Sequence, residues 1–144
     1  MSDPIYMETT KKDPEDTMAE IKKLLKKYGM TRFNESYSNG ELHGCIFAVD
    51  IDGKELAFSL PINWRPLLDR ANRGETKYIR PGDAEQSRRV AWRQVLRWIE
   101  SQLALIDLGM AEFQEIFLPY VMINATQTLY QKMLDTNFKL LEEK

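Results

Sequence analysis

The 144-residue chain contains a single cysteine, Cys45, and a single histidine, His43. One cysteine cannot form an intramolecular disulfide, and one cysteine with one histidine falls short of the three or four ligands that zinc takes. We therefore expect no disulfide and no metal site, and a reducing cytoplasm as the compartment. No apolar run approaches the roughly 20 residues that cross a bilayer, and residues 1–12 lack the apolar core of a signal peptide.

Recognisable catalytic motifs are also missing, since the sequence has no glycine-rich phosphate loop, nucleophile elbow or zinc motif. His43 and Cys45 would share one face of a strand, as a catalytic dyad requires, but a buried cysteine beside a strand-end histidine is the commoner arrangement. Asp50 and Asp52 suit a turn, with a divalent ion as the alternative. We expect no catalytic residues, no cofactor and no enzymatic activity.

The length and a hydrophobic content of 43% favour one folded domain. Residues 1–16 have two prolines, several charges and no apolar periodicity, which predicts a flexible N-terminal arm. We expect a single α+β domain over residues 17–144, interrupted by a long basic loop at 61–82. A loop of that length is typical of a functional or mobile segment.

Capping and turn signals define the elements before the loop. Thr17 and Glu20 have the spacing of a capping box at the start of a helix that ends at Gly29. Asn39-Gly40 and Asp52-Gly53 predict two-residue hairpin turns between strands at 32–38, 42–51 and 54–60. The middle strand is apolar on both faces, with Leu42, Ile46 and Ala48 opposite Cys45 and Phe47, so its second face is expected to be covered.

Three helices are predicted after the loop. Asp83 is a suitable N-cap for a helix over 84–108, which Gly109 ends, and a short helix at 111–118 stops at Pro119. Thr126 would cap the last helix. That helix would present an apolar face on one side, made of Leu129, Met133, Leu134, Phe138 and Leu141. The order α-β-β-β-α-α-α predicts an α+β fold, with an N-terminal helix, a three-stranded antiparallel sheet and a C-terminal helical part.

Positive charge is concentrated in one quarter of this chain of net charge −2, because residues 65–97 hold nine basic and four acidic residues. The candidate phosphate- or partner-binding residues are Arg65, Arg70, Arg73, Lys77 and Arg80 on the loop and Arg88, Arg89, Arg93 and Arg97 on the following helix. They would line a phosphate backbone or bind a partner. Alternatively, they pair with acids such as Glu85, Glu100 and Asp107.

Several motifs between residues 84 and 132 resemble a family of small phage-encoded proteins of unknown function. They are Val90-Ala91-Trp92-Arg93, Trp98, Gln102-Leu103-Ala104, Gly109-Met110, Glu115-Ile116-Phe117-Leu118-Pro119-Tyr120 and Leu129-Tyr130. The resemblance implies a phage or prophage gene expressed in a bacterial cytoplasm, and it implies no activity.

Two functions from different classes remain. The favoured hypothesis is an accessory protein that binds a host or phage protein as an inhibitor or adaptor, counter-defence being one such role, with Trp64 as the candidate hot spot. The alternative is a nucleic-acid-binding protein that uses the basic loop and helix face. The net acidic composition favours the first, and the doubly apolar middle strand makes a homodimer plausible.

Overall fold

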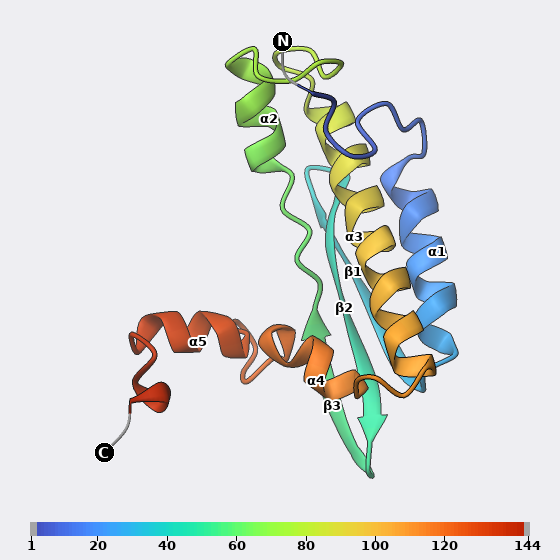
Figure 1. The fold of residues 1–144 in the computed structure, drawn as a ribbon, viewed down its shortest axis with the longest axis vertical. Coiled ribbons are helices and arrows are strands. Elements are labelled where there is room, and N and C mark those ends of the chain that lie inside the picture. The colour runs from blue at the N-terminus through green and yellow to red at the C-terminus, as the bar shows by residue number, and fades with distance from the viewer. Residues whose placement is uncertain (1–2, 143–144) are drawn as a thin grey trace. The chain divides into compact units, whose positions relative to one another are not determined.

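The computed structural model describes residues 3–142 and has the predicted α+β fold, with one helix, a three-stranded antiparallel sheet and then the remaining helices (Figure 1). The chain divides into two compact units. The helical unit comprises Met1–Leu25 and Pro61–Ser101, and the sheet unit comprises Lys26–Leu60 and Gln102–Lys144. The single domain expected over residues 17–144 stays a prediction.

Helix α1 (Pro14–Lys26) begins three residues before the predicted start. Proline suits the first turn of a helix because the amide hydrogen it lacks would have no helical partner there, and Glu15 and Asp16 complement the positive end of the helix dipole. Thr17 therefore lies inside the helix. Its side chain is fully buried, and its hydroxyl accepts a hydrogen bond from Arg93 instead of capping the helix.

Helix α2 (Arg65–Asn72) occupies part of the segment for which a loop was predicted. It is held by non-local packing, because its Ala71 forms a buried cluster with Ile79 and Val90, against which Ile5 and Leu67 pack. Residues 3–16 also differ from the expected loose arm, since Glu8 is buried and Ile5 is half-buried. The arm and the segment after α2 therefore take part in the packing of the helical unit.

Helix α3 (Ala84–Asp107) confirms the predicted long helix and both of its end signals. The side chain of Asp83 accepts a hydrogen bond from the backbone N–H of Gln86 at 3.0 Å, as an N-cap does. Gly109 has a φ of +74°, and its N–H donates to the carbonyl of Ile106, which closes the last turn. Its apolar side chains are buried at Ala91, Trp92, Val95, Ile99 and Leu103, with Trp92 and Ile99 fully so.

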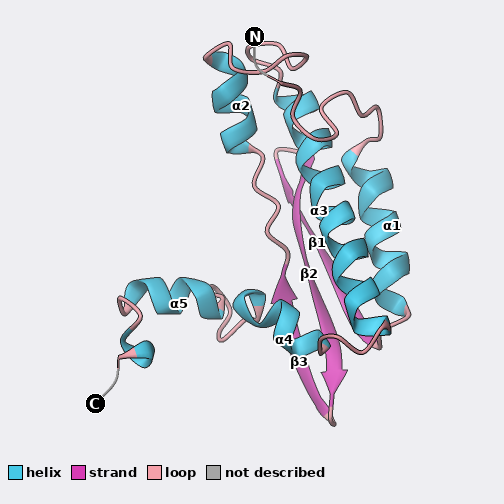
Figure 2. Ribbon diagram, viewed as in Figure 1, coloured by secondary structure: helices cyan, strands magenta, loops and turns pink. Residues whose placement is uncertain are grey.

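Strands β1 (Met30–Ser38), β2 (Glu41–Ile51) and β3 (Lys54–Ser59) lie in that order in one antiparallel sheet (Figure 2). Both hairpin predictions are confirmed. Asn39-Gly40 has φ values of +52° and +77°, and Asp52-Gly53 has +54° and +83°, so both central residues of each turn have the positive φ of a type I′ turn.

A β-bulge in β2 changes the face on which Leu42 lies. Tyr37 pairs with Leu42 and Ser36 pairs with Gly44, so His43 is an extra residue in the ladder. This residue shifts the alternation, and Leu42 joins the buried side chains of Cys45 and Phe47 on one face of the sheet. The prediction that Leu42 shares the second face with Ile46 and Ala48 is therefore wrong.

Four phenylalanines form the core of the sheet unit. Helix α4 (Phe113–Phe117) brings Phe113 and Phe117 against Phe47 and Phe58 of the sheet. The ring centroids of Phe47 and Phe58 are 5.4 Å apart, and each ring of α4 lies 5.7–6.2 Å from each of these two rings. Three of the four side chains are at most 1% exposed. The 3₁₀ turn η1 (Leu118–Tyr120) follows and contains Pro119.

The C-terminal helix is shorter than predicted. Helix α5 (Leu129–Asp135) starts after Thr128, which forms a capping box with Gln131, whereas the prediction placed the cap at Thr126. Asn137 and Phe138 have left-handed backbone, which ends the helical path before the 3₁₀ turn η2 (Lys139–Leu141). None of the residues of α5 is buried.

Candidate partner-binding surface

Trp64 lies at the start of α2, where the local backbone fixes its position. Its carbonyl accepts hydrogen bonds from the N–H groups of Leu67 and Leu68 at 3.1 and 3.2 Å, which close the first turn. Pro66 stands in that turn and holds its φ in the helical range. The side chain of Trp64 is half-buried, so it combines a fixed position with an accessible part.

Two arginine side chains lie over the indole ring of Trp64. The Cζ atom of Arg65 is 5.1 Å from the ring centroid, and that of Arg88 on α3 is 5.3 Å from it. Both distances lie within the range of a cation–π interaction, which contributes about 0.5–1 kcal/mol at an exposed site. The guanidinium groups are thereby kept beside an apolar ring instead of being dispersed in solvent.

A groove of about 270 Å³ lies between the segment leading into α2, α2 itself and the middle of α3. Its lining residues are Pro61, Asn63, Pro66, Leu67, Arg70, Ala91, Gln94 and Val95. Most of these side chains are apolar, and the charged one is Arg70. The groove can take an apolar side chain at a position where a positive charge is also available.

The three arginines spaced four residues apart on α3 are all bonded to acids. Arg89 pairs with Asp13 at 2.9 Å and with Glu85 at 2.5 Å, and Arg97 pairs with Glu100 at 2.6 Å. These hydrogen bonds raise the pKa values of both arginines, with Asp13 as the main cause for Arg89. The alternative of pairing with Glu85 and Glu100 is confirmed for these two residues.

Arg93 is the most buried member of the row, with 5% of its surface exposed. It pairs with Glu20 of α1, and it donates a hydrogen bond to the hydroxyl of Thr17 at 3.2 Å. Its Nε atom has no partner among the residues that the structure describes. A side chain in this position joins α1 to α3 inside the helical unit, and it is not presented to a ligand at the surface.

The remaining candidate residues lie on α2 and the segment after it, and all are exposed. Arg73 pairs with Glu75 at 2.6 Å, and the ammonium group of Lys77 lies 5.4 Å from the centroid of the Tyr78 ring. Within residues 3–142, no ion pair joins Arg65, Arg70, Lys77 or Arg80 to an acid. These four cations are therefore the ones available for a partner.

A buried carboxylate, which the sequence analysis missed, positions the segment that carries Lys77 and Arg80. Glu8 is 2% exposed and accepts hydrogen bonds from the backbone N–H groups of Ile5 at 2.7 Å, Ile79 at 2.9 Å and Tyr78. Burial raises the pKa of Glu8, but these N–H donors outweigh the burial and hold it below its usual value. No sequence pattern marks this contact, because its partners are about 70 residues apart.

Further backbone contacts of the N-terminal segment involve Gln86 on α3. Its side-chain amide donates to the carbonyl oxygens of Glu8 at 2.8 Å and Thr10 at 2.9 Å. Together with the Glu8 carboxylate, this amide fixes residues 5–10 against the segment after α2 and the first turn of α3. Residues 5–10, which were expected to be flexible, therefore hold the segment after α2 that carries Lys77 and Arg80.

The groups considered for catalysis or metal binding are separated by their environments. Cys45 is 2% exposed, and burial raises the pKa of its thiol to about 12, whereas His43 is exposed. Asp50 accepts a hydrogen bond from the N–H of Gly53 at 2.8 Å, as turn chemistry requires. Residues 3–142 contain no group of three metal-ligating side chains, and no helix among them has the length and apolarity to cross a membrane.

Comparison with known proteins places the chain in no family: no protein-family model matches it, and neither does any curated protein or solved structure. The resemblance of residues 84–132 to small phage-encoded proteins therefore stays a prediction.

Proposed function

We propose that the protein is a non-enzymatic accessory protein of phage origin that binds a host or phage protein, as an inhibitor or adaptor, in the bacterial cytoplasm. The observation that carries this proposal is the Trp64 surface, which consists of Trp64, the guanidinium groups of Arg65 and Arg88 over its ring, and the adjoining groove with Arg70. Tryptophan and arginine are the residue types most enriched among the energetic hot spots of protein interfaces.

The Trp64 surface is organised before any partner arrives. Trp64 is held by the first turn of α2, and the two arginines already lie over its ring. Binding then costs less side-chain entropy, about 0.5–1.5 kcal/mol less for each flexible side chain that is already ordered. A small preorganised patch can in this way reach useful affinity without a large contact area.

The chemistry of the surface indicates the kind of partner. Arg65 and Arg70 are exposed and form no ion pair with an acid within the described chain, and the groove beside them is mostly apolar. A complementary partner presents an acidic patch with an apolar side chain in its midst. The positive charge would accelerate encounter with such a patch, and the groove would supply the burial that slows dissociation.

Nucleic-acid binding is the second candidate, favoured by four exposed cations on α2 and the segment after it, Arg65, Arg70, Lys77 and Arg80, and by the ring of Trp64 next to Arg65. Base stacking on Trp64 and phosphate contacts from these cations would suit a single strand. Against it, Arg73, Arg89, Arg93 and Arg97 are bonded to acids, which leaves fewer charges for a phosphate backbone than the sequence suggested. We therefore rank the protein-binding function first.

The test is an affinity pull-down of the tagged full chain from phage-infected and uninfected bacterial lysate, with and without nuclease, at low and moderate salt. We expect a specific protein that remains after nuclease treatment and is lost with Trp64→Ala. The matched control is Tyr78→Ala, which removes an exposed ring from the same unit, outside the Trp64 surface. Recovery of nucleic acid that moderate salt releases would instead support the second candidate. A protein retained equally by Trp64→Ala would contradict the proposed surface.

A further inference from the structure

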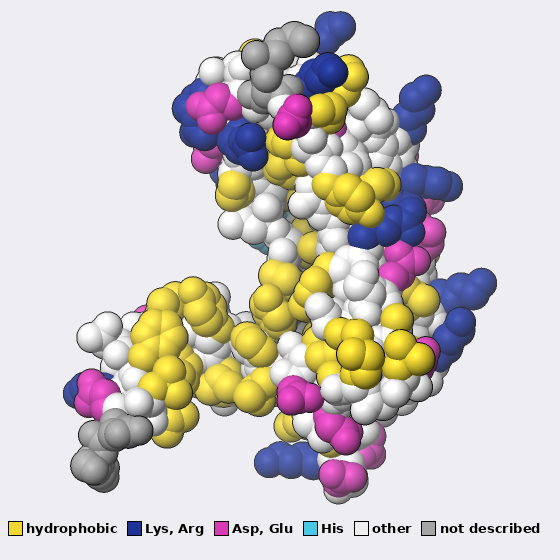
Figure 3. Space-filling model, in the orientation of Figure 1, with side chains coloured by type: hydrophobic (Ala, Val, Ile, Leu, Met, Phe, Trp, Pro, Cys, Tyr) yellow, Lys and Arg dark blue, Asp and Glu magenta, His cyan; other side chains and the backbone are white. Residues whose placement is uncertain are grey.

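The C-terminal part of the sheet unit exposes an unusual number of large apolar side chains. On α5, Tyr130 is 51% exposed and Leu134 is 49% exposed, and residues four apart lie on one face of a helix. We call the full set the C-terminal apolar surface: Leu118, Ile123, Tyr130, Leu134, Leu140 and Leu141. Figure 3 shows hydrophobic side chains gathered over α5. Apolar surface concentrated in this way is typical of a contact with another protein.

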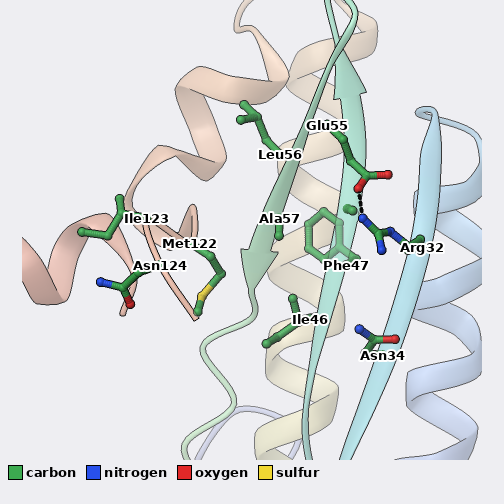
Figure 4. Close-up of a pocket in the computed structure, with 11 residues that line it drawn as sticks. Arg32, Asn34, Ile46, Phe47, Glu55, Leu56, Ala57, Met122, Ile123 and Asn124 are labelled. Carbon is green, nitrogen blue, oxygen red and sulfur yellow. Dashed lines mark hydrogen bonds and ion pairs between the residues drawn. The ribbon is translucent and has the colours of Figure 1, made fainter. Parts of the chain in front are cut away.

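The second face of the sheet carries a groove with complementary properties. The groove has a volume of about 430 Å³, and its floor includes the cross-strand pair of Ala48 and Ala57. Ile46 lies beside Ala57, and Met122 and Ile123 of the same chain line the groove as well (Figure 4). Side chains as small as alanine let a facing helix approach the sheet closely. Arg32 and Glu55 form an ion pair on one side of this floor, and Asn34 lies near its other end.

Helix α5 of the same chain is held away from this groove by a tight hairpin. Val121 bridges Phe58 of β3, the N–H of Met122 donates to the carbonyl of Ala57 at 2.7 Å, and Met122 bridges Thr128. The turn between them is closed by the side chain of Asn124, which accepts hydrogen bonds from the N–H groups of Thr126 and Gln127.

These bonds fix the first residue of α5 relative to the edge of β3, and α5 extends from there away from the sheet (Figure 1). The helix cannot lie on its own groove unless the hairpin breaks. A helix from another molecule can do so.

We propose that a second copy of this chain occupies the groove, with α5 of each protomer packed on the second sheet face of the other. The sheet unit contains both surfaces, a helix with exposed apolar side chains and a groove with a small apolar floor and polar walls. A two-fold axis pairs both at once, as an isologous interface requires. The inference concerns the sheet unit and does not depend on the Trp64 surface.

The charges of both surfaces permit association of identical copies. Within residues 129–142, Lys132 and Lys139 balance Asp135 and Glu142, and on the groove Arg32 balances Glu55. Neither surface therefore carries a net charge that would repel a second copy. An acidic or basic partner, in contrast, would find no opposite charge to match.

Sedimentation velocity of the full chain over a range of concentrations tests the proposal. We expect the wild type to have twice the mass of the 16.9 kDa chain in the micromolar range. Leu134→Glu on α5 and Ala57→Glu in the groove should each weaken dimerisation at least tenfold, because each places a charge in an apolar contact. Gln131→Glu is the matched control: it adds the same charge to α5, and glutamate preserves the capping box.

Mixing the two variants gives the sharpest result. The Leu134→Glu chain keeps an intact groove and the Ala57→Glu chain keeps an intact α5, so the mixture retains one complete contact and should form more dimer than either variant alone. If Ala57→Glu fails to fold by circular dichroism, Asn34→Glu at the exposed groove wall replaces it. A monomeric wild type at 100 µM, about the highest working concentration, would overturn the proposal. So would a groove variant that dimerises normally.

Discussion

The carboxylate of Glu8 allows a quantitative test of how the N-terminal segment is held. In Glu8→Gln, one of the two oxygens becomes an NH₂ group, and either Ile5 or the pair Tyr78 and Ile79 loses its acceptor. Hydrogen bonds to a charged group contribute about 1.5–3 kcal/mol each, and a buried donor without a partner costs about 1–3 kcal/mol. We expect Glu8→Gln to lower the free energy of unfolding by about 2–3 kcal/mol at pH 7.

The assay is urea unfolding followed by circular dichroism, with the loss read from the midpoint at unchanged slope. Glu8→Ala should cost more, because it removes both acceptors. The matched control is Asp3→Asn, an exposed acid in the same segment, which should change the free energy of unfolding by less than about 0.5 kcal/mol. A loss for Glu8→Gln no larger than that of the control would refute the reasoning.

The difference in free energy of unfolding between wild type and Glu8→Gln should depend on pH in a defined direction. The pKa of Glu8 is lower in the folded protein than in the unfolded chain, so its contribution is complete above the unfolded value of about 4.3. It is lost as the pH falls through the folded pKa. The stability difference between wild type and Glu8→Gln should therefore stay constant above about pH 5 and shrink below pH 4.

Three further predictions concern Trp92, Tyr28 and Cys45. Trp92 is fully buried, and its Nε1 atom has no partner within the described chain. Trp92→Ala should therefore lower the free energy of unfolding in urea by about 3–5 kcal/mol, and Trp92→Phe by less than half of that. Equal losses for the two variants would contradict the packing of Trp92. The phenol of Tyr28 donates to Asp107 at 2.7 Å, which raises its pKa to about 12. The stabilising effect of this bond is complete below pH 10 and should disappear between pH 10 and 12, as the loss of the stability difference from Tyr28→Phe will show. Cys45 should react with a thiol reagent only at the rate of unfolding, since it is buried and its pKa is about 12; rapid reaction of the native protein would disprove this.

The elements that the sequence predicted well are those set by neighbouring residues. Asn39-Gly40, Asp52-Gly53 and the cap at Asp83 act within a few residues, and all three are confirmed. Helix α2 was missed because it is only eight residues long and is stabilised by contacts of Ala71 with Ile79 and Val90, which lie outside the helix. The cap of α5 is Thr128 and not the predicted Thr126, because Gln131 lies at the spacing that completes a capping box with Thr128.

The sequence identified the residues of the candidate surface, but it could not predict which of them lie together or which are bonded to acids. Trp64 and its basic neighbours were identified from composition. The acids that bond to the arginines on α3 lie partly in α1 and in the segment before it, more than 70 residues away in the case of Asp13 and Glu20. Only the folded chain shows which cations are left for a partner, and Glu8 had no sequence signal at all.

The extra residue in β2 also limits how the length of the chain can vary. Side chains before and after His43 alternate between the two faces of β2 in different phase, and the extra residue His43 lets both Leu42 and Phe47 lie on the buried face. Replacing the exposed His43 by another polar residue should be tolerated, whereas deleting it would turn either Leu42 or the whole of Cys45–Val49 to the opposite face. Natural variants of this protein should therefore substitute freely at this position and almost never lose it.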